Sequence, residues 1–272
     1  MRLVIFTNRD LASNLFLNHI MPHVAPYVVH IFLSDKVGKA TTSATPKELK
    51  DMKFFEQILP NEFIFPSLDA QNRIFTEGGK LMTFNELSRH YNVPIESLNG
   101  VRSVESLDKI AALQPDLALS VRYGRIFGSD FLKIPKRGVI NLHSGRLPQY
   151  RGVLPAFRAL MNDDDVIYPT LHYIEDGTID TGGIIGFSEL KVENDKSLLW
   201  HILHLYIASV DLVAHAIQQI AEGIKPLAQG QDDINAAYFT FPTADEIALF
   251  LEKTKRNFID SEEYAAFLKS YI

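Results

Sequence analysis

The chain has 272 residues, of which 46% are hydrophobic, and a formal net charge of −6 at pH 7. A chain of this length can bury roughly 70–75% of the surface that its unfolded form exposes, so it can build a full core without staples. It contains no cysteine, which excludes disulfides, thiolate metal sites and a thiol nucleophile. The acidic balance argues against a nucleic-acid partner, because phosphate binding favours a basic face.

The start of the chain, MRLVIFTNRD, is one short apolar run followed by polar residues. It has neither the length nor the small-residue cleavage pattern of a signal peptide, so we interpret it as a first strand. We find no run of ~20 apolar residues of the kind that spans a membrane. We therefore expect a cytoplasmic protein that makes no membrane contact.

The first elements alternate between strand and helix. Residues 3–7 read as a buried strand, 11–24 have helical spacing, and 27–33 are again strand-like. This alternation predicts an α/β protein with a doubly wound, mainly parallel sheet. TNRDLASN follows the first strand without a G-x-G-x-x-G pattern, so the dinucleotide fingerprint is absent. The polar residues 36–53 are predicted to form a loop or insertion.

The pattern weakens between residues 61 and 103 and sharpens again after residue 106. In the weaker part we predict a strand at 62–66 and short helices at 83–91 and 94–98. In the remainder we predict, in chain order, a helix at 106–113, strands at 116–121 and 138–143, a helix at 153–161, strands at 169–174 and 183–192, and one long helix at 197–220.

This layout indicates one catalytic domain over residues 1–230 and a short helical C-terminal extension over residues 231–272. The extension contains apolar helical segments such as ADEIALFLEK. Such helices either pack on the core or form the seam of a homodimer, and the sequence leaves both open.

The stretch GVINLHSGRLPQYRG places two polar side chains at the end of a buried strand. Asn141 and His143 are two residues apart, so both project from the same side of the strand. Asp180 follows after one predicted helix and one predicted strand, and a right-handed crossover would return the chain beside the first strand. Because ligands of open α/β sheets bind beyond the carboxyl ends of strands, we expect these three side chains to converge there.

An amide, an imidazole and a carboxylate together suit acyl transfer to an amine. Attack on a formyl or acyl carbon creates an oxyanion, which an amide N–H and an imidazolium stabilise. A carboxylate can hold the imidazole in its charged form and relay the proton that the attacking nitrogen loses. No side-chain nucleophile is needed, in keeping with the missing cysteine.

The segment INLHSGRLPQYRG resembles the catalytic segment of the 10-formyltetrahydrofolate-dependent formyltransferases. That family includes glycinamide ribonucleotide transformylase, methionyl-tRNA formyltransferase and the sugar N-formyltransferases. The positions that match its pattern are Asn141, His143, Leu147, Pro148, Gly152 and Asp180. The resemblance implies a Rossmann-like formyltransferase fold, with Asn141, His143 and Asp180 as catalytic residues.

A second segment, PDLALSVRYGRIF, is similar to the family's strand and turn beside the folate pteridine. The resemblance implies that 10-formyltetrahydrofolate is the co-substrate, held by backbone groups of Arg125 and Phe127 with Ile126 packing nearby. One departure is that Gly145 and Arg146 stand where relatives commonly have Ser and Leu. Arg146 and Arg151 are our candidates for binding a phosphate or carboxylate of the acceptor.

The resemblance implies transfer of a formyl group to a primary amine of a small molecule, with a nucleotide-linked amino sugar as the leading acceptor. Three alternatives stay open: a formyltetrahydrofolate hydrolase, a methionyl-tRNA formyltransferase and a non-catalytic folate-binding module. The transfer-RNA enzymes of the family add a larger C-terminal RNA-binding domain, and the acidic charge also weighs against that reading. We expect no metal site.

Three other histidines are interpreted as structural. His172 lies within a predicted strand and is expected to be a packed or edge histidine. His201 and His204 lie at i, i+3 on the long predicted helix, but no nearby carboxylate completes a familiar set of metal ligands. We expect them to form part of a packed helix face.

Overall fold

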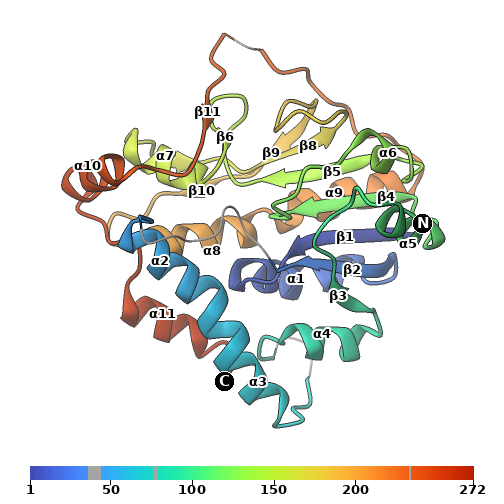
Figure 1. The fold of residues 1–272 in the computed structure, drawn as a ribbon, viewed down its shortest axis with the longest axis horizontal. Coiled ribbons are helices and arrows are strands. Elements are labelled where there is room, and N and C mark those ends of the chain that lie inside the picture. Colours follow the sequence, from blue (N-terminus) through green and yellow to red (C-terminus); the bar gives the residue numbers. More distant parts are fainter. Residues whose placement is uncertain (36–43, 76–78, 233) are drawn as a thin grey trace.

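A seven-stranded sheet with helices on both faces forms the centre of the protein (Figure 1). A computed structural model describes residues 1–35, 44–75, 79–232 and 234–272. This architecture confirms the predicted α/β class and its mainly parallel sheet.

The elements follow one another with short connections. The strands are β1 (Leu3–Asn8), β2 (Val28–Ser34), β3 (Ile95–Ser97), β4 (Leu117–Val121), β5 (Val139–His143), β6 (Arg151–Gly152), β7 (Val166–Ile167), β8 (Thr170–Ile174), β9 (Ile184–Phe187), β10 (Leu190–Lys191) and β11 (Tyr238–Phe239). The helices are α1 (Leu11–Val24), α2 (Lys47–Lys53), the π-helix η1 (Phe54–Ile64), α3 (Phe65–Asp69), α4 (Phe84–Tyr91), α5 (Val104–Ala112), α6 (Ser129–Leu132), α7 (Pro155–Met161), α8 (Leu198–Ala208), α9 (Val210–Ala221), α10 (Ala244–Thr254) and α11 (Ser261–Leu268).

The strand order of the main sheet is β3-β2-β1-β4-β5-β8-β9. From β3 to β5 all neighbours are parallel, whereas β8 runs antiparallel to β5, and β9 antiparallel to β8. The chain moves outward from β1 in one direction through β2 and β3, and in the other through β4 and β5. The order therefore reverses between β1 and β4, which is where open sheets of this kind bind ligands.

Alternation along β1 explains why both faces of the sheet are covered. Leu3 and Ile5 belong to the large core cluster that also contains the apolar side of α1, α8 and α9. Val4 and Phe6 point to the other face and join the smaller cluster with Ile110 of α5. A strand buried on both faces is continuously apolar, as this one is.

Two short elements of the first half differ from their predictions. Residues 62–66 are helical, because they continue the run of helix from α2 through η1 into α3. Residues 94–98 were predicted to be helical, but Ile95–Ser97 form the edge strand β3, paired to β2 through Ile31 and Ile95. In both places the tertiary partner, rather than local propensity, selects the conformation. Thr83 begins α4 with a capping box to Glu86, as a helix predicted over 83–91 requires.

The polar region 36–53 is described only in part. Residues 36–43 lie outside the described residues, and Lys47–Lys53 form the helix α2 rather than a loop. The strand predicted over 183–192 is also divided, because β9 lies in the main sheet whereas β10 pairs with β7.

The helix predicted over 197–220 breaks at Ser209 into α8 and α9. The Ser209 hydroxyl donates to Leu205 O and is bonded to the Ser188 hydroxyl, so the break is held from both sides. Within the described part of the chain, Leu198–Ala221 is a stretch long and apolar enough by composition to cross a bilayer, which our sequence analysis did not expect. Its most apolar window is 56% buried in the protein, as in a core helix. The cytoplasmic location stays a prediction.

Residues beyond 230 pack on the core at several places. The strand β11 pairs in parallel with β6, and the helix α10 contacts α7. The hydroxyl of Tyr271 is buried and donates to Asn14 Oδ1 of α1. The C-terminal segment therefore covers the core; the division into two parts at residue 230 and a homodimer both stay predictions.

Candidate active site

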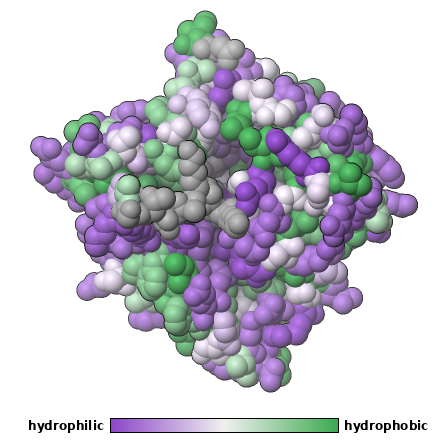
Figure 2. All heavy atoms as spheres, in the orientation of Figure 1, coloured by the Kyte–Doolittle hydropathy of each residue, from purple (hydrophilic) through white to green (hydrophobic). Residues whose placement is uncertain are grey.

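The predicted catalytic strand is β5, which lies in the sheet between β4 and β8. Its register places Asn141 opposite His172 of β8, and His143 opposite Thr170. The strand is almost fully buried, so its polar side chains need partners within the protein. Figure 2 shows this face of the molecule hollowed near its centre, over the carboxyl ends of β4 and β5 in the view of Figure 1.

The amide of Asn141 is oriented by His172. The Nδ1 of His172 lies 2.8 Å from the backbone oxygen of Tyr173, and a carbonyl can only accept, so Nδ1 carries the proton. The Nε2 atom is then an acceptor, and it lies 3.0 Å from Asn141 Nδ2. Asn141 therefore directs its N–H group to His172, which leaves a second N–H on the same nitrogen.

Both ring nitrogens of His143 face acceptors. Nε2 lies 2.7 Å from the backbone oxygen of Tyr150, and Nδ1 lies 3.4 Å from Asp180 Oδ2. In the imidazolium form both nitrogens are donors, so both contacts are then favourable. His143 is buried, which strengthens its interaction with the carboxylate.

Asp180 is the point where the polar groups meet. Its Oδ2 accepts a hydrogen bond of 3.0 Å from the Gly152 N–H, and its Oδ1 lies 3.6 Å from His172 Nε2. Burial on its own raises the pKa of the Asp180 carboxyl, but positive charge on His143 and the Gly152 N–H outweigh burial and lower that pKa to about 2. The carboxylate is therefore ionised throughout the neutral range.

Asp180 arrives by a different route from the one predicted. We expected a right-handed crossover to a parallel strand, but β8 runs antiparallel to β5, and the turn between β8 and β9 brings Asp180 over the strand end. Gly182 lies in that turn, and a Cβ there would come within 1.9 Å of Tyr173 O. Only glycine fits so close to the backbone.

The segment assigned to folate binding leaves the sheet directly after β4. Because Val121 of β4 is paired with Leu142 of β5, this segment begins beside the catalytic strand. Phe127 is buried in the smaller core cluster, whereas the side chain of Ile126 is 46% exposed. The Nε atom of Arg125 is buried without a hydrogen-bond partner among the described residues.

The two arginines assigned to the acceptor are in different settings. Arg146 is exposed and its guanidinium carbon lies 4.8 Å from the centre of the Tyr168 ring. Arg151 instead donates from Nε and Nη2 to Gln231 Oε1, at 3.2 and 2.9 Å. Arg151 is therefore engaged within the protein.

The structure brings together Asn141, His143 and Asp180, and it adds His172, which our sequence analysis interpreted as a packed or edge histidine. His172 is indeed buried, but it contacts Asn141 and lies beside Asp180. The only signal in the sequence was a histidine on the next strand, and its register with Asn141 depends on the antiparallel pairing. His201 fits its structural interpretation, since Nε2 accepts from Glu193 N–H and Nδ1 contacts Ser197 O.

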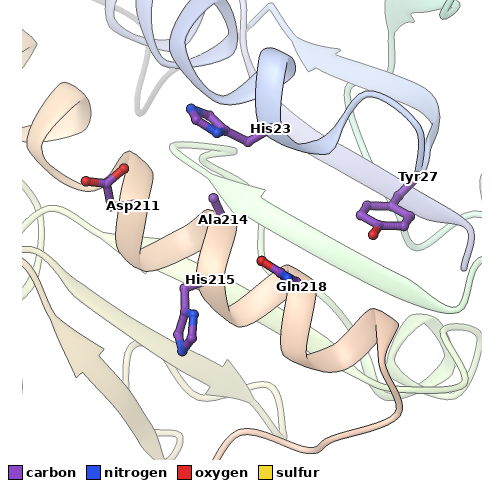
Figure 3. Close-up of a pocket in the computed structure, with 6 residues that line it drawn as sticks. All are labelled: His23, Tyr27, Asp211, Ala214, His215 and Gln218. Carbon is purple, nitrogen blue, oxygen red and sulfur yellow. The ribbon is translucent and has the colours of Figure 1, made fainter.

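A separate hollow of about 290 Å³ lies between α1 and α9, lined by His23, Tyr27, Asp211, Ala214, His215 and Gln218 (Figure 3). Tyr27 O accepts from Leu3 N–H at the beginning of β1, so this hollow lies at the amino edge of the strands. Asn141, His143 and Asp180 lie toward the opposite, carboxyl edge. The hollow is distinct from the candidate active site.

Comparison with known proteins gives one family. Residues 85–199 match the family model described as formyl transferase, and this range includes Asn141, His143 and Asp180. A methionyl-tRNA formyltransferase of Halothermothrix orenii is 30% identical over 156 residues, which are 56% of this chain and 48% of the relative. A methionyl-tRNA formyltransferase of Thermodesulfovibrio yellowstonii is 33% identical over 118 residues, 43% of this chain and 38% of the relative. The chain thus spans about half the length of the first of these curated relatives.

Solved structures share the fold over most of the chain. The N-formyltransferase from Helicobacter canadensis, solved with folinic acid and dTDP-3-aminofucose, superposes with a TM-score of 0.60 at 16% identity, covering 97% of this chain and 82% of that one. Glycinamide ribonucleotide transformylase 1 from Symbiobacterium toebii gives a TM-score of 0.55 at 16% identity, covering 85% and 94%. At this identity the likeness is one of fold.

Proposed function

The chain belongs to the formyl transferase family, and from that premise we propose that it transfers a formyl group from 10-formyltetrahydrofolate to a primary amine of a small molecule. One observation carries the proposal. Asp180 Oδ2 lies 3.4 Å from His143 Nδ1, and Asn141, on the same strand as His143, is held by His172 beside Asp180. This is the constellation that the addition of an amine to a formyl carbon requires.

The neutral amine attacks the formyl carbon, and the C=O bond becomes a C–O⁻ bond of a tetrahedral intermediate. Asn141 stabilises the oxyanion through the N–H that His172 does not use. The imidazolium of His143 adds a positive charge in a buried site. Its Nε2–H is bonded to Tyr150 O, so direct donation to the oxyanion requires that hydrogen bond to be exchanged.

Asp180 holds His143 in the charged form and takes up or relays the proton that the attacking nitrogen loses. Its carboxylate is ready for this role because it is ionised at neutral pH. When the intermediate collapses, the bond between the formyl carbon and N10 of the folate breaks, and N10 regains a proton. The products are the formamide and tetrahydrofolate.

We assign the folate to the segment after β4, where backbone groups of Arg125 and Phe127 bind the pterin and Ile126 packs against it. The exposed side chain of Ile126 supports this assignment, as does the buried Nε of Arg125 that has no partner among the described residues. Both features suit a segment that is completed by a ligand.

We propose a nucleotide-linked amino sugar as the acceptor, with Arg146 as a ligand for its phosphate. The exposed guanidinium of Arg146 can bind such a group while it stacks on Tyr168. Arg151 is the second candidate ligand, and its binding of a phosphate would require it to exchange its contact with Gln231. The net charge of −6 favours a small acceptor over a transfer RNA.

The test is a formyl-transfer assay with 10-formyltetrahydrofolate and separate arms for amino sugars, glycinamide ribotide, methionyl-tRNA and water. We expect turnover with an amino sugar, and we expect Asn141→Ala and His143→Ala each to lower kcat by about 10²–10³-fold, because each removes stabilisation of the oxyanion. Asn85→Ala and His90→Ala are matched controls, since both residues are exposed and lie on α4.

Full turnover in Asn141→Ala and His143→Ala would refute the assigned roles. Rapid loss of the formyl group in the water arm would indicate a hydrolase. Folate binding with no turnover in any arm would indicate a binding module.

A further inference from the structure

Gln231 lies on the segment between α9 and β11 and reaches the turn that carries Asp180. Its Nε2 donates two hydrogen bonds of 2.8 Å, one to the backbone oxygen of Asp180 and one to that of Gly182. Both protons of the side-chain amide are thus used on one short piece of backbone. Gln231 lies 51 positions from Asp180 in the sequence, so no local pattern connects them.

Arg151 determines which end of the Gln231 amide faces the turn. The guanidinium donates from Nε and Nη2 to Gln231 Oε1, so the amide oxygen must face Arg151 and the nitrogen must face the two carbonyls. The side chain of Gln231 is half-buried, which lowers the competition from water for these bonds.

The turn needs such support because its backbone is unusual. Asp180 has φ of +56°, a left-handed conformation that costs a non-glycine residue free energy and persists only where its surroundings hold it. The two backbone oxygens that Gln231 binds flank the peptide groups on either side of Thr181. Removing these bonds frees the backbone to relax toward a conformation with negative φ.

The other end of Asp180 is held by the same C-terminal segment. Its carboxylate accepts from the Gly152 N–H, and Gly152 lies on β6, which is paired with β11. The Val153 N–H donates to Phe239 O at 2.9 Å, and the Arg151 N–H to Ala237 O at 3.0 Å, so Gly152 is fixed from both sides. Residues 231–239 thus hold both the backbone and the carboxylate of Asp180.

We propose that Gln231 is a positioning residue for Asp180: it holds the turn in the conformation that keeps the carboxylate between His143 and the Gly152 N–H. This inference rests on the proposed function, in which Asp180 orients His143. The side chain of Gln231 touches no reacting atom; its effect passes through the backbone of Asp180.

The kinetic test replaces Gln231 by leucine, which keeps a similar size and removes both donors. We expect kcat to fall about 10- to 100-fold, as a displacement of about 1 Å of a catalytic group does, with little change in the KM for 10-formyltetrahydrofolate. Gln229→Leu is the matched control, because Gln229 is exposed and lies two residues earlier on the same segment. In an Asp180→Asn background, Gln231→Leu should lower kcat no further, because the residue that it positions has already been altered.

A second variant, Gln231→Glu, guards against a loss of folding. It keeps the acceptor for Arg151 but cannot donate to the two backbone oxygens. Hydrogen exchange at the Gly152 amide, followed by NMR without any substrate, is the independent readout. We expect faster exchange in Gln231→Leu and Gln231→Glu, and wild-type exchange in Gln229→Leu.

Wild-type kcat together with wild-type Gly152 exchange in both Gln231 variants would overturn the proposal. So would a fall in kcat without any change at Gly152. If the wild-type protein transfers a formyl group to no acceptor, the proposed function fails, but Gly152 exchange still decides whether Gln231 holds Asp180.

Discussion

The orientation of a single amide depends on a backbone oxygen one residue beyond the neighbouring histidine. Tyr173 O fixes the proton of His172 on Nδ1, His172 Nε2 thereby becomes an acceptor, and the acceptor in turn selects which end of the Asn141 amide points toward it. Asn141 is thus prepared to donate before any substrate arrives. Preorganised donors of this kind need no rearrangement in the transition state.

His172→Phe should test this orientation, because phenylalanine has a similar shape but no acceptor. We expect kcat for formyl transfer to fall about 10- to 100-fold, since Asn141 loses its fixed direction. The free energy of unfolding should fall by about 1–3 kcal/mol, because a buried N–H loses its partner. The control is His204→Phe, a histidine on α8 that contacts Trp200 O. A kcat within twofold of wild type in His172→Phe would contradict this account.

At the scale of elements, the pairing of β6 with β11 joins the active-site loop to the C-terminal segment. Gly152 lies in this pair with φ of +98°, and a Cβ there would come within 2.2 Å of Phe239 O. Glycine is needed at this position for two reasons, its backbone conformation and the close approach of the neighbouring strand.

A comparison of two glycines separates these reasons. Gly138 has φ of +88° but nothing within 4 Å of its missing Cβ, so Gly138→Ala should cost only the conformational strain, about 1 kcal/mol. Gly152→Ala carries the strain and the backbone clash together, and we expect it to cost about 2–4 kcal/mol. Urea unfolding of both variants and the wild type measures the difference. Equal costs at the two positions would show that the approach of β11 is not tight.

At the scale of the whole molecule, Arg122 joins segments from distant parts of the chain. It follows β4 and forms ion pairs with Asp10 at the start of α1, at 3.0 Å, and with Glu56 of η1, at 2.9 Å. One guanidinium serves two buried carboxylates, so the group carries a net negative charge when both are ionised. Burial raises the pKa of Glu56, Arg122 opposes the rise and Asp10 adds to it, with a result of about 7.

This shift has a defined sign for stability. Between the ordinary pKa of 4.5 and the raised value of about 7, the folded protein retains a proton on Glu56 that the unfolded chain has lost. Stability from this group therefore falls as the pH rises through that window and is fully present only below it. We expect wild type to lose about 1–3 kcal/mol more than Glu56→Gln between pH 4.5 and pH 8, measured by urea unfolding. Parallel profiles for the two proteins would argue against a proton held at Glu56.

Several features were predictable because neighbouring residues carry them. The strands β1, β4 and β5 show as apolar runs, and the spacing of Asn141 and His143 places them on one face whatever the strand's neighbours are. The order Asn141, His143, Asp180 was enough to predict that the three side chains meet. In contrast, Ile95–Ser97 became a strand only because β2 offers an edge to pair with.

The sequence by itself determined the α/β class and the three polar residues at the end of the central strand, because periodicity and short motifs are properties of adjacent residues. Only the tertiary structure decided that β8 returns antiparallel, that His172 therefore faces Asn141, and that Gln231 and Arg151 hold the Asp180 turn. These relations join positions that lie tens of residues apart. Strand register and the packing of the C-terminal segment establish them, and neither is encoded in a local pattern.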